Sequence, residues 1–374
     1  MDDLQKRSWA EISLKSIEHN YRNIRSLLPP CCRFMGVVKA NAYGHGAVEV
    51  SRLLEKLGCE YLGVATFDEA RELRDAGIGL PILILGHTPP NLAPEMARLD
   101  ITQAVANLGV AREMAGILEG KRLKIHIKLE TGMGRIGFSH ASPRTMEEIL
   151  ELLALPCFDA EGIFTHFAVS DVYGDSFTQE QFRRFKETVS KLEEASGHTF
   201  AIKHCANSGA VINYPETYLD MVRPGLALYG MYPGNEKGSL DLRPAMSLKT
   251  RVAAVYEQAP GDTISYGRTF TVEKDMRVAV LPIGYADGLH RIASNKIDVL
   301  IHGKRARQLG RICMDMCMVD VTDIPDCRPG DVAIIFGSDG DAYLPVEELA
   351  EKCGTINYEI VCSPSRRIPR IYVD

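Results

Sequence analysis

The sequence predicts an α/β protein in two parts, a (β/α)8 barrel of the TIM type followed by a β-rich C-terminal domain. Short apolar segments alternate with amphipathic ones about eight times up to about residue 225, which is what a closed parallel barrel requires. An open doubly wound sheet, the alternative, usually has fewer strands. After residue 241, short alternating segments with glycine turns indicate β-structure. We therefore predict a barrel over 1–241 and a β-rich domain over 242–374.

Composition and charge exclude several classes of function. The chain has 374 residues, 45% of them hydrophobic and 25% charged, as in ordinary globular proteins. Its net charge of -6 and its lack of a Lys/Arg tract predict no nucleic-acid or membrane partner. The N-terminus lacks an apolar signal segment, which predicts a cytoplasmic protein.

The 10 scattered cysteines then indicate free thiols. Cys313 and Cys317 lack a second ligand pair, so no metal is predicted.

The elements follow in order along the chain. Apolar residues at helical spacing predict a helix after Ser13 that ends before Pro29. Apolar segments predict the barrel strands 34–38, 61–65, 82–85, 101–105, 123–129, 160–166, 201–205 and 218–223. Amphipathic spacing predicts helices over 67–76, 109–118, 145–155 and 178–195. In the second domain we expect strands 251–257, 277–282, 298–301, 318–321 and 331–336 and a helix 345–352.

Unusual polar residues cluster directly after predicted barrel strands. They are Lys39, Tyr43, Lys128, Thr131, Arg135, His166, Asn207, Ser208 and Arg223. These positions are the C-terminal mouth of a barrel, where loops from different strands build the active site. The sequence therefore predicts one pocket at this mouth.

The residue types in this predicted pocket suit one cofactor. Ser208 and the backbone of Gly225 and Leu226 follow the last two strands, where barrels often bind phosphate. The Tyr43 hydroxyl can add a further contact. A lysine amine such as that of Lys39 forms a Schiff base with the aldehyde of pyridoxal phosphate. We therefore predict that pyridoxal 5'-phosphate binds here, with His166 and Arg223 also in contact with it.

Four motifs resemble those of one family. Residues 37–46, Val-Val-Lys-Ala-Asn-Ala-Tyr-Gly-His-Gly, are similar to the cofactor-lysine signature of bacterial alanine racemase. Residues 128–135, 223–230 and 310–315 are similar to three further blocks, and the resemblance covers essentially the whole chain. Glu130 is a small departure, because many members have Asp there, and it preserves the charge.

The resemblance implies a head-to-tail homodimer with shared active sites. Lys39 would carry the pyridoxal-phosphate aldimine and act as one acid/base group, with Tyr266 of the other subunit as the second. Two such groups are needed because racemisation removes a proton from one face of a planar intermediate and returns one to the other face. Tyr358 would contact the cofactor and join Tyr266 as a gate, and Tyr285 would line the entry.

The resemblance also implies how substrate and cofactor ring are held. Arg135 would pair with the substrate carboxylate, helped by the Met314 backbone from the partner chain and the adjacent Asp315. Lys128, otherwise a like charge beside Arg135, would be carbamylated. Arg223 would face the pyridine nitrogen, and because arginine keeps its proton, this nitrogen should stay unprotonated.

The leading hypothesis is thus an alanine racemase that supplies D-alanine for peptidoglycan. A racemase of serine or of a broader range of amino acids is an alternative, as is a related pyridoxal-phosphate decarboxylase. A non-catalytic cofactor-binding protein of the single-barrel type is a further alternative, but residues 242–374 argue against it because such proteins have no β-domain.

Overall fold

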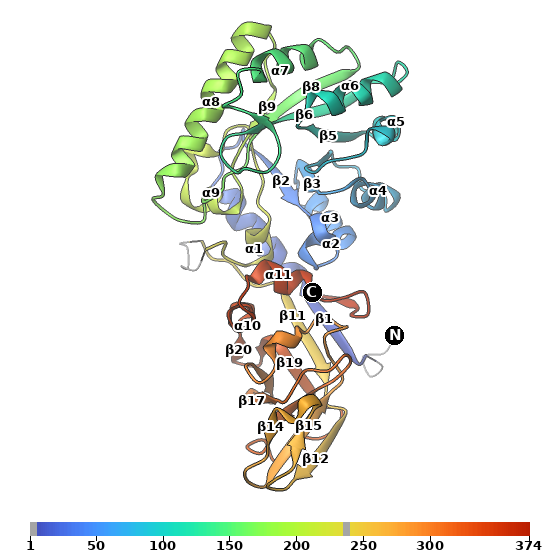
Figure 1. The fold of residues 1–374 in the computed structure, drawn as a ribbon, viewed down its shortest axis with the longest axis vertical. Coiled ribbons are helices and arrows are strands. Elements are labelled where there is room, and N and C mark those ends of the chain that lie inside the picture. Colours follow the sequence, from blue (N-terminus) through green and yellow to red (C-terminus); the bar gives the residue numbers. More distant parts are fainter. Residues whose placement is uncertain (1–5, 235–239) are drawn as a thin grey trace. The chain divides into compact units, whose positions relative to one another are not determined.

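A computed structural model describes residues 6–234 and 240–374. The chain divides into two compact units. One is Ser16–Arg243, and the other combines Pro244–Asp374 with the N-terminal residues up to Lys15. Figure 1 shows a unit of parallel strands covered by helices and a second unit rich in β-strands.

The first unit is built on eight parallel strands in the order β10-β2-β3-β4-β5-β6-β8-β9. Their bounds are β2 Arg33–Val37, β3 Tyr61–Val64, β4 Ile82–Ile84, β5 Ile101–Val105, β6 Leu123–Glu130, β8 Phe158–Phe164, β9 Ile202–His204 and β10 Met221–Val222. The short β7, Phe138–Ser139, also pairs with β6.

The two end strands of this sheet, β9 and β10, approach each other through backbone hydrogen bonds. The N–H of Asp220 donates to the carbonyl of Lys203 at 3.1 Å, and that of Arg223 donates to Ala206 at 2.9 Å. The sheet is therefore nearly closed, and the predicted (β/α)8 barrel is confirmed.

Helices cover the barrel strands. They are α1 Leu14–Ser26, α3 Ala47–Lys56, α4 Phe67–Asp75, α5 Ala93–Arg98, α6 Leu108–Ile117, α7 Thr145–Leu153, α8 Ser176–Ser196 and α9 Ser208–Asn213. Short 3-10 segments lie at Pro90–Leu92, Pro215–Thr217 and Leu226–Tyr229. Side chains from β2, β3, β4, β5, β8, β9 and β10 form one buried cluster: Met35, Tyr61, Leu83, Ala104, Phe164, Ile202 and Met221. The barrel interior is therefore a packed core, and its loops are left to form a site.

The second unit is mainly antiparallel. Its large sheet has the strands β1 Ser8–Ser13, β11 Met246–Arg251, β12 Ala254–Gln258, β15 Met276–Leu281, β16 Asp298–Ile301, β17 Lys304–Leu309, β18 Cys317–Asp320, β19 Val332–Asp339, β20 Ala342–Leu344 and β21 Arg370–Val373. A small ribbon pairs β13 Thr263–Ile264 with β14 Phe270–Thr271. Helices α10 Val346–Cys353 and α11 Asn357–Cys362 follow β20, and 3-10 segments lie at Tyr266–Arg268 and Arg291–Ala293.

The structure corrects the predicted domain division at the N-terminus. We expected the whole of 1–241 to belong to the barrel. Instead, β1 pairs antiparallel with β11 and parallel with β21, which places it in the second unit. The cause is the strand's own pattern: Ala10 and Ile12 are fully buried, whereas Glu11 and Ser13 are half-buried. The other boundary, at Arg243 and Pro244, lies two residues from the predicted one.

Two further features bear on partners and ions. In residues 6–234 and 240–374, no helix combines the length and apolarity needed to cross a membrane. Within the same ranges, no group of three or more His, Cys, Asp and Glu side chains is arranged to hold a metal ion.

Candidate active site

Lys39 begins a left-handed turn directly after β2. Residues 40–43 all have positive φ values of 51° to 54°, although none of them is glycine. This conformation costs roughly 1–2 kcal/mol for each non-glycine residue. Gly44 and Gly46 follow with φ of 82° and 99°, which glycine adopts without strain. A strained run of this kind persists only where the surrounding structure enforces it, and such runs concentrate at functional sites.

Two side chains hold this turn, one from outside residues 37–46 and one from within them. The carboxylate of Glu69, on α4, accepts hydrogen bonds from the backbone N–H of Ala40 and of Ala65, both at 2.7 Å. The Asn41 side chain accepts one from the N–H of Ala47 at 2.8 Å. Glu69 was not among the predicted site residues, although Thr66 and Glu69 have the spacing of a capping box, which the structure contains.

Ser208 and Gly225, two of the residues predicted to bind phosphate, contact each other directly. The Ser208 hydroxyl accepts hydrogen bonds from the N–H groups of Gly225 and Ala227, at 2.9 and 3.3 Å. A Cβ on Gly225 would lie only 2.5 Å from the Tyr43 hydroxyl oxygen. The turn that follows Lys39 and the turn after β10 are therefore in close contact, and residue 225 must be glycine to leave room for the Tyr43 hydroxyl. Asn207 caps α9 through a 3.0 Å hydrogen bond from the N–H of Ala210.

Cationic side chains cluster at the same mouth. Arg223 is buried and donates to the carbonyls of Thr165 and Cys205, at 2.8 and 3.1 Å, and lies 3.4 Å from Nδ1 of His166. Burial lowers the pKa of Arg223 to about 10. Burial and then the Arg223 charge lower the pKa of His166 well below its usual value, so this imidazole is neutral.

The pKa of the Lys128 amine is strongly perturbed. It is only 4% exposed, and its Nζ lies 4.9 Å from the ring centre of Phe164. Burial, followed by the charges of Arg223 and Arg135, lowers its pKa to about 7. Lys39 adds a smaller effect in the same direction. The charges of Lys39, Arg135 and Arg223 act on both Lys128 and His166, so these five residues lie near one another.

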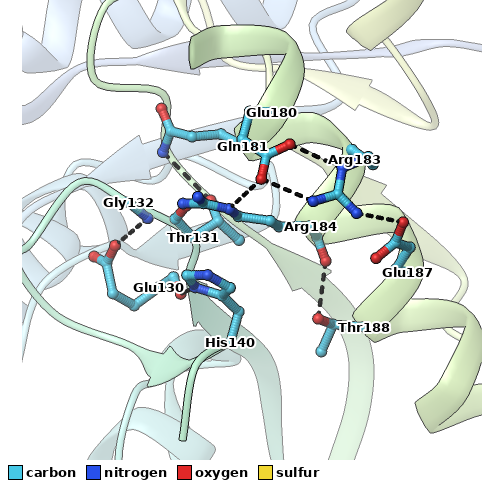
Figure 2. A network of polar contacts seen from close by, with 10 residues as sticks. All are labelled: Glu130, Thr131, Gly132, His140, Glu180, Gln181, Arg183, Arg184, Glu187 and Thr188. Atoms are coloured by element: carbon cyan, nitrogen blue, oxygen red, sulfur yellow. Dashed lines mark hydrogen bonds and ion pairs between the residues drawn. The ribbon is translucent and has the colours of Figure 1, made fainter.

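Side chains of helix α8 donate hydrogen bonds to the loop that carries Arg135 (Figure 2). The Gln181 amide nitrogen donates to the Thr131 hydroxyl at 3.3 Å and to the His166 carbonyl at 3.1 Å. Arg184 donates to the Thr131 carbonyl at 2.9 Å. Because Gln181 is fully buried, it fixes two active-site loops at once. Its place on the buried face of a helix is the one sequence feature that could have indicated it.

Glu130 shapes the same loop from its first residue (Figure 2). Its carboxylate accepts hydrogen bonds from the N–H of Gly132 at 2.5 Å and of Arg135 at 3.2 Å. Burial raises the pKa of Glu130, but these and further backbone hydrogen bonds outweigh burial and lower it. The charge kept by Glu in place of Asp is therefore used to order the loop.

The remaining predicted site residues lie in the second unit. Tyr266 is 70% exposed and follows Ser265, whose φ is 67°. Tyr285 and Met314 are also exposed, and backbone hydrogen bonds of 3.0 Å join residues 285 and 286 to the carbonyls of 313 and 314. Asp315 forms a 2.7 Å ion pair with Arg367, and Tyr358 lies half-buried on α11. The side chains of Tyr285 and Met314, in loops, and of Tyr266, in a 3-10 segment, are therefore exposed.

Comparison with known proteins is consistent along the whole chain. Residues 12–233 match the family described as "Alanine racemase, N-terminal domain", and residues 245–372 match "Alanine racemase, C-terminal domain". An alanine racemase of Desulforamulus reducens is 48% identical over 98% of each chain. One from Methanococcus maripaludis is 47% identical over 98% of each chain.

Solved structures agree with these matches. Alanine racemase from Clostridium difficile superposes with a TM-score of 0.93 at 42% identity, covering 99% of this chain and 96% of that one. The Bacillus anthracis enzyme with bound L-Ala-P has a TM-score of 0.93 at 35% identity, covering 99% and 95% of the two chains. On this evidence from both domains, the chain belongs to the alanine racemase family.

Proposed function

We propose that this chain interconverts L-alanine and D-alanine with pyridoxal 5'-phosphate as its cofactor. The observation that carries the proposal is the meeting of the strained Lys39 turn with the turn after β10, where Gly225 leaves space beside the Tyr43 hydroxyl. This contact supports a site in which an amine and a cradle of backbone N–H groups and hydroxyls share one barrel mouth.

The residues at the mouth fit this cofactor. Ser208, Tyr43 and the backbone of Gly225 and Leu226 would hold the phosphate, with Asn207 fixing the loop. Arg223 would donate to the ring nitrogen, and His166 would contribute to the polar surroundings of the ring. Tyr358 would reach the cofactor from the second domain. When bound, the cofactor supplies an electron-withdrawing ring that acidifies the α-proton of the amino acid.

Two side chains would move the proton. The Lys39 amine would take or return the α-proton on one face, and Tyr266 of the partner subunit would do so on the other. Tyr266 is 70% exposed, which suits a residue that serves another chain of a homodimer.

Arg135 would bind the substrate carboxylate through two parallel hydrogen bonds. Lys128 lies close enough to Arg135 for the two charges to interact, and its amine has a pKa of about 7. We propose that Lys128 is carbamylated, with its nitrogen attacking carbon dioxide and releasing a proton to solvent. The resulting anion would hold Arg135 in place of a repelling cation.

Substrate size would be set mainly by the second domain. Tyr266 and Tyr358 would form a gate that admits a methyl side chain, Tyr285 would line the entry, and Met314 with Asp315 would contact the substrate from the partner subunit. The product D-alanine suits peptidoglycan synthesis in the cytoplasm.

A panel of L-amino acids tests this function against the alternatives. Purified protein is incubated with alanine, serine, a larger amino acid or a diamino acid, and both the D-isomer and carbon dioxide are measured. We expect D-alanine to form fastest, without carbon dioxide. Faster inversion of serine would favour the broader racemase, and carbon dioxide from the diamino acid would favour a decarboxylase. The absence of any conversion would contradict the proposal.

A further inference from the structure

Behind Arg223, a chain of hydrogen bonds runs through the barrel interior. The Arg223 guanidinium lies 2.9 Å from Nδ1 of His204. Nε2 of His204 lies 2.8 Å from Nδ1 of His126, and Nε2 of His126 lies 3.3 Å from the Glu161 carboxylate. Arg223 and both histidines are buried, and β9, β6 and β8 contribute one member each.

The hydrogen bonds from Arg223 to Glu161 can run in only one donor-to-acceptor direction. A guanidinium only donates, so Nδ1 of His204 must accept. Burial lowers the pKa of both His204 and His126, so each ring is neutral with a single N–H. His204 then carries its proton on Nε2 and donates to Nδ1 of His126. His126 in turn donates from Nε2 to Glu161. Every N–H group in this series of hydrogen bonds therefore points away from Arg223 and toward the Glu161 carboxylate.

Glu161 is a permanent anion at the far end. The Tyr61 hydroxyl donates to it at 2.6 Å, and the Thr102 hydroxyl is 3.4 Å away. Burial would raise the pKa of Glu161, but hydrogen bonds from His126 and Tyr61 outweigh it and lower the pKa to about 2. The carboxylate therefore accepts hydrogen bonds without competing as a donor.

The backbone of β6 and β8 is shaped to accommodate these hydrogen-bonded side chains. The pairing of β6 with β8 shifts register between Ile125 and His126, so that Glu161 is the additional residue of a bulge. Bulges re-aim side chains beside active sites. The next residue, Gly162, has no side chain, and a Cβ there would lie 2.5 Å from Nδ1 of His126. The imidazole of His126 thus occupies space that any larger residue at 162 would take.

Arg223 needs such support because its charge is buried without a direct counter-ion. Among the described residues, its hydrogen-bond partners are carbonyl oxygens and histidine nitrogens, and it forms no ion pair with a carboxylate. A buried cation without compensation is strongly disfavoured. Hydrogen bonds in sequence polarise one another, so an anion at one end strengthens the contact at the other.

We propose that Glu161 is a positioning residue for Arg223, acting through the neutral Nε2–H tautomers of His126 and His204. The proposal rests on the proposed function in one respect, that Arg223 faces the cofactor ring. These hydrogen bonds would fix one edge of the Arg223 guanidinium. The remaining N–H groups of Arg223 would then keep a constant direction toward the ring nitrogen.

Nitrogen-15 NMR of histidine-labelled, full-length protein tests the chain directly. Substitutions His126→Gln and His204→Gln assign the two rings. We expect both to be neutral, with the proton on Nε2. A proton on Nδ1 of either ring, or a charged imidazole at neutral pH, would overturn the proposal. The result does not depend on substrate, so it stands apart from success or failure of the racemase assay.

The variant Glu161→Leu tests the functional consequence. It removes the final acceptor, so His126 should lose its Nε2–H preference, and the absorption spectrum of bound cofactor should change. We expect kcat for alanine to fall by about tenfold or more, as for other outer supporting residues, with KM changed much less. Asp159→Leu, at an exposed position of the same strand, should change none of these.

If Glu161→Leu does not fold, Gly162→Ala gives the same test by displacing His126. A merely structural role would lower the yield of folded protein while leaving tautomers, spectrum and kcat of the folded fraction unchanged, and that result would contradict the proposal.

Discussion

A carboxylate oxygen of Glu69 accepts a 2.7 Å hydrogen bond from the N–H of Ala40, the residue that follows Lys39. The other oxygen binds the N–H of Ala65 at the end of β3. One side chain on α4 therefore joins two strand ends at the barrel mouth and stabilises the left-handed turn that presents Lys39.

Substitution Glu69→Ala should destabilise the protein by about 1–3 kcal/mol, because the backbone N–H groups of Ala40, Ala65 and Thr66 lose a charged acceptor. It should also weaken cofactor retention, since the turn is no longer enforced. Urea unfolding and dialysis of the bound cofactor measure the two effects. Glu72→Ala, at an exposed position of the same helix, should change stability by less than about 0.5 kcal/mol. Equal effects of the two variants would disprove this role.

Substitution Gly225→Ala should weaken cofactor binding roughly tenfold to a hundredfold, because overpacking costs about 1–3 kcal/mol. The added methyl would meet the Tyr43 hydroxyl at 2.5 Å. Titration of the cofactor-free protein measures the affinity. Gly116→Ala is the matched control, since nothing lies within 4 Å of a Cβ there. It should stabilise α6 by about 0.5–1 kcal/mol and leave affinity unchanged. Unaltered affinity in Gly225→Ala would remove Gly225 from the cradle.

Protein in ¹³C-bicarbonate should show a carbamate resonance that disappears in Lys128→Ala. The amine has a pKa of about 7 because of burial and nearby positive charge, so its neutral, nucleophilic form and the carbamate signal should both increase as pH rises through 7. Lys124→Ala, on the same strand, should keep the signal, because the hydrogen bond that Lys124 donates to Asp100 raises the pKa of Lys124. Persistence of the resonance in Lys128→Ala would place the modification elsewhere.

Single variants Lys39→Ala and Tyr266→Phe should each lose nearly all racemase activity, since each lacks one acid/base group. Dissociating and reassociating an equal mixture should restore part of it, because a mixed dimer contains one site with both groups intact. Each variant treated alone controls for the procedure. If mixing restores nothing while mixed dimers form, Tyr266 does not act in the partner's site.

Much of the barrel was predictable because its strands are almost fully buried and therefore read as uninterrupted apolar segments. Segment 82–85, for example, is observed as Ile82–Ile84. The N-terminal strand was not predicted, because six residues give too short an alternation to identify a partner, and its partners lie more than 230 residues away. Helix α9 was missed for a similar reason: six residues, half of them small, carry little periodicity.

The candidate site could be predicted where the type of residue itself indicates its chemistry, as at Lys39, Arg223 and Ser208. Residues that act by holding others could not. Glu69, Gln181 and His204 contact backbone groups or neighbouring rings that only the folded barrel brings near. The predicted strand 251–257 likewise divides into β11 and β12, because the chain leaves one neighbour and pairs with another at residues 252 and 253.

The most direct test of the central claim is circular dichroism of L-alanine incubated with the purified protein. We predict that the signal decays to zero while total alanine stays constant and no other product forms, and that Lys39→Ala abolishes the decay. A stable signal with the cofactor-loaded protein, or a decay accompanied by loss of alanine, would contradict the assignment of this chain as an alanine racemase.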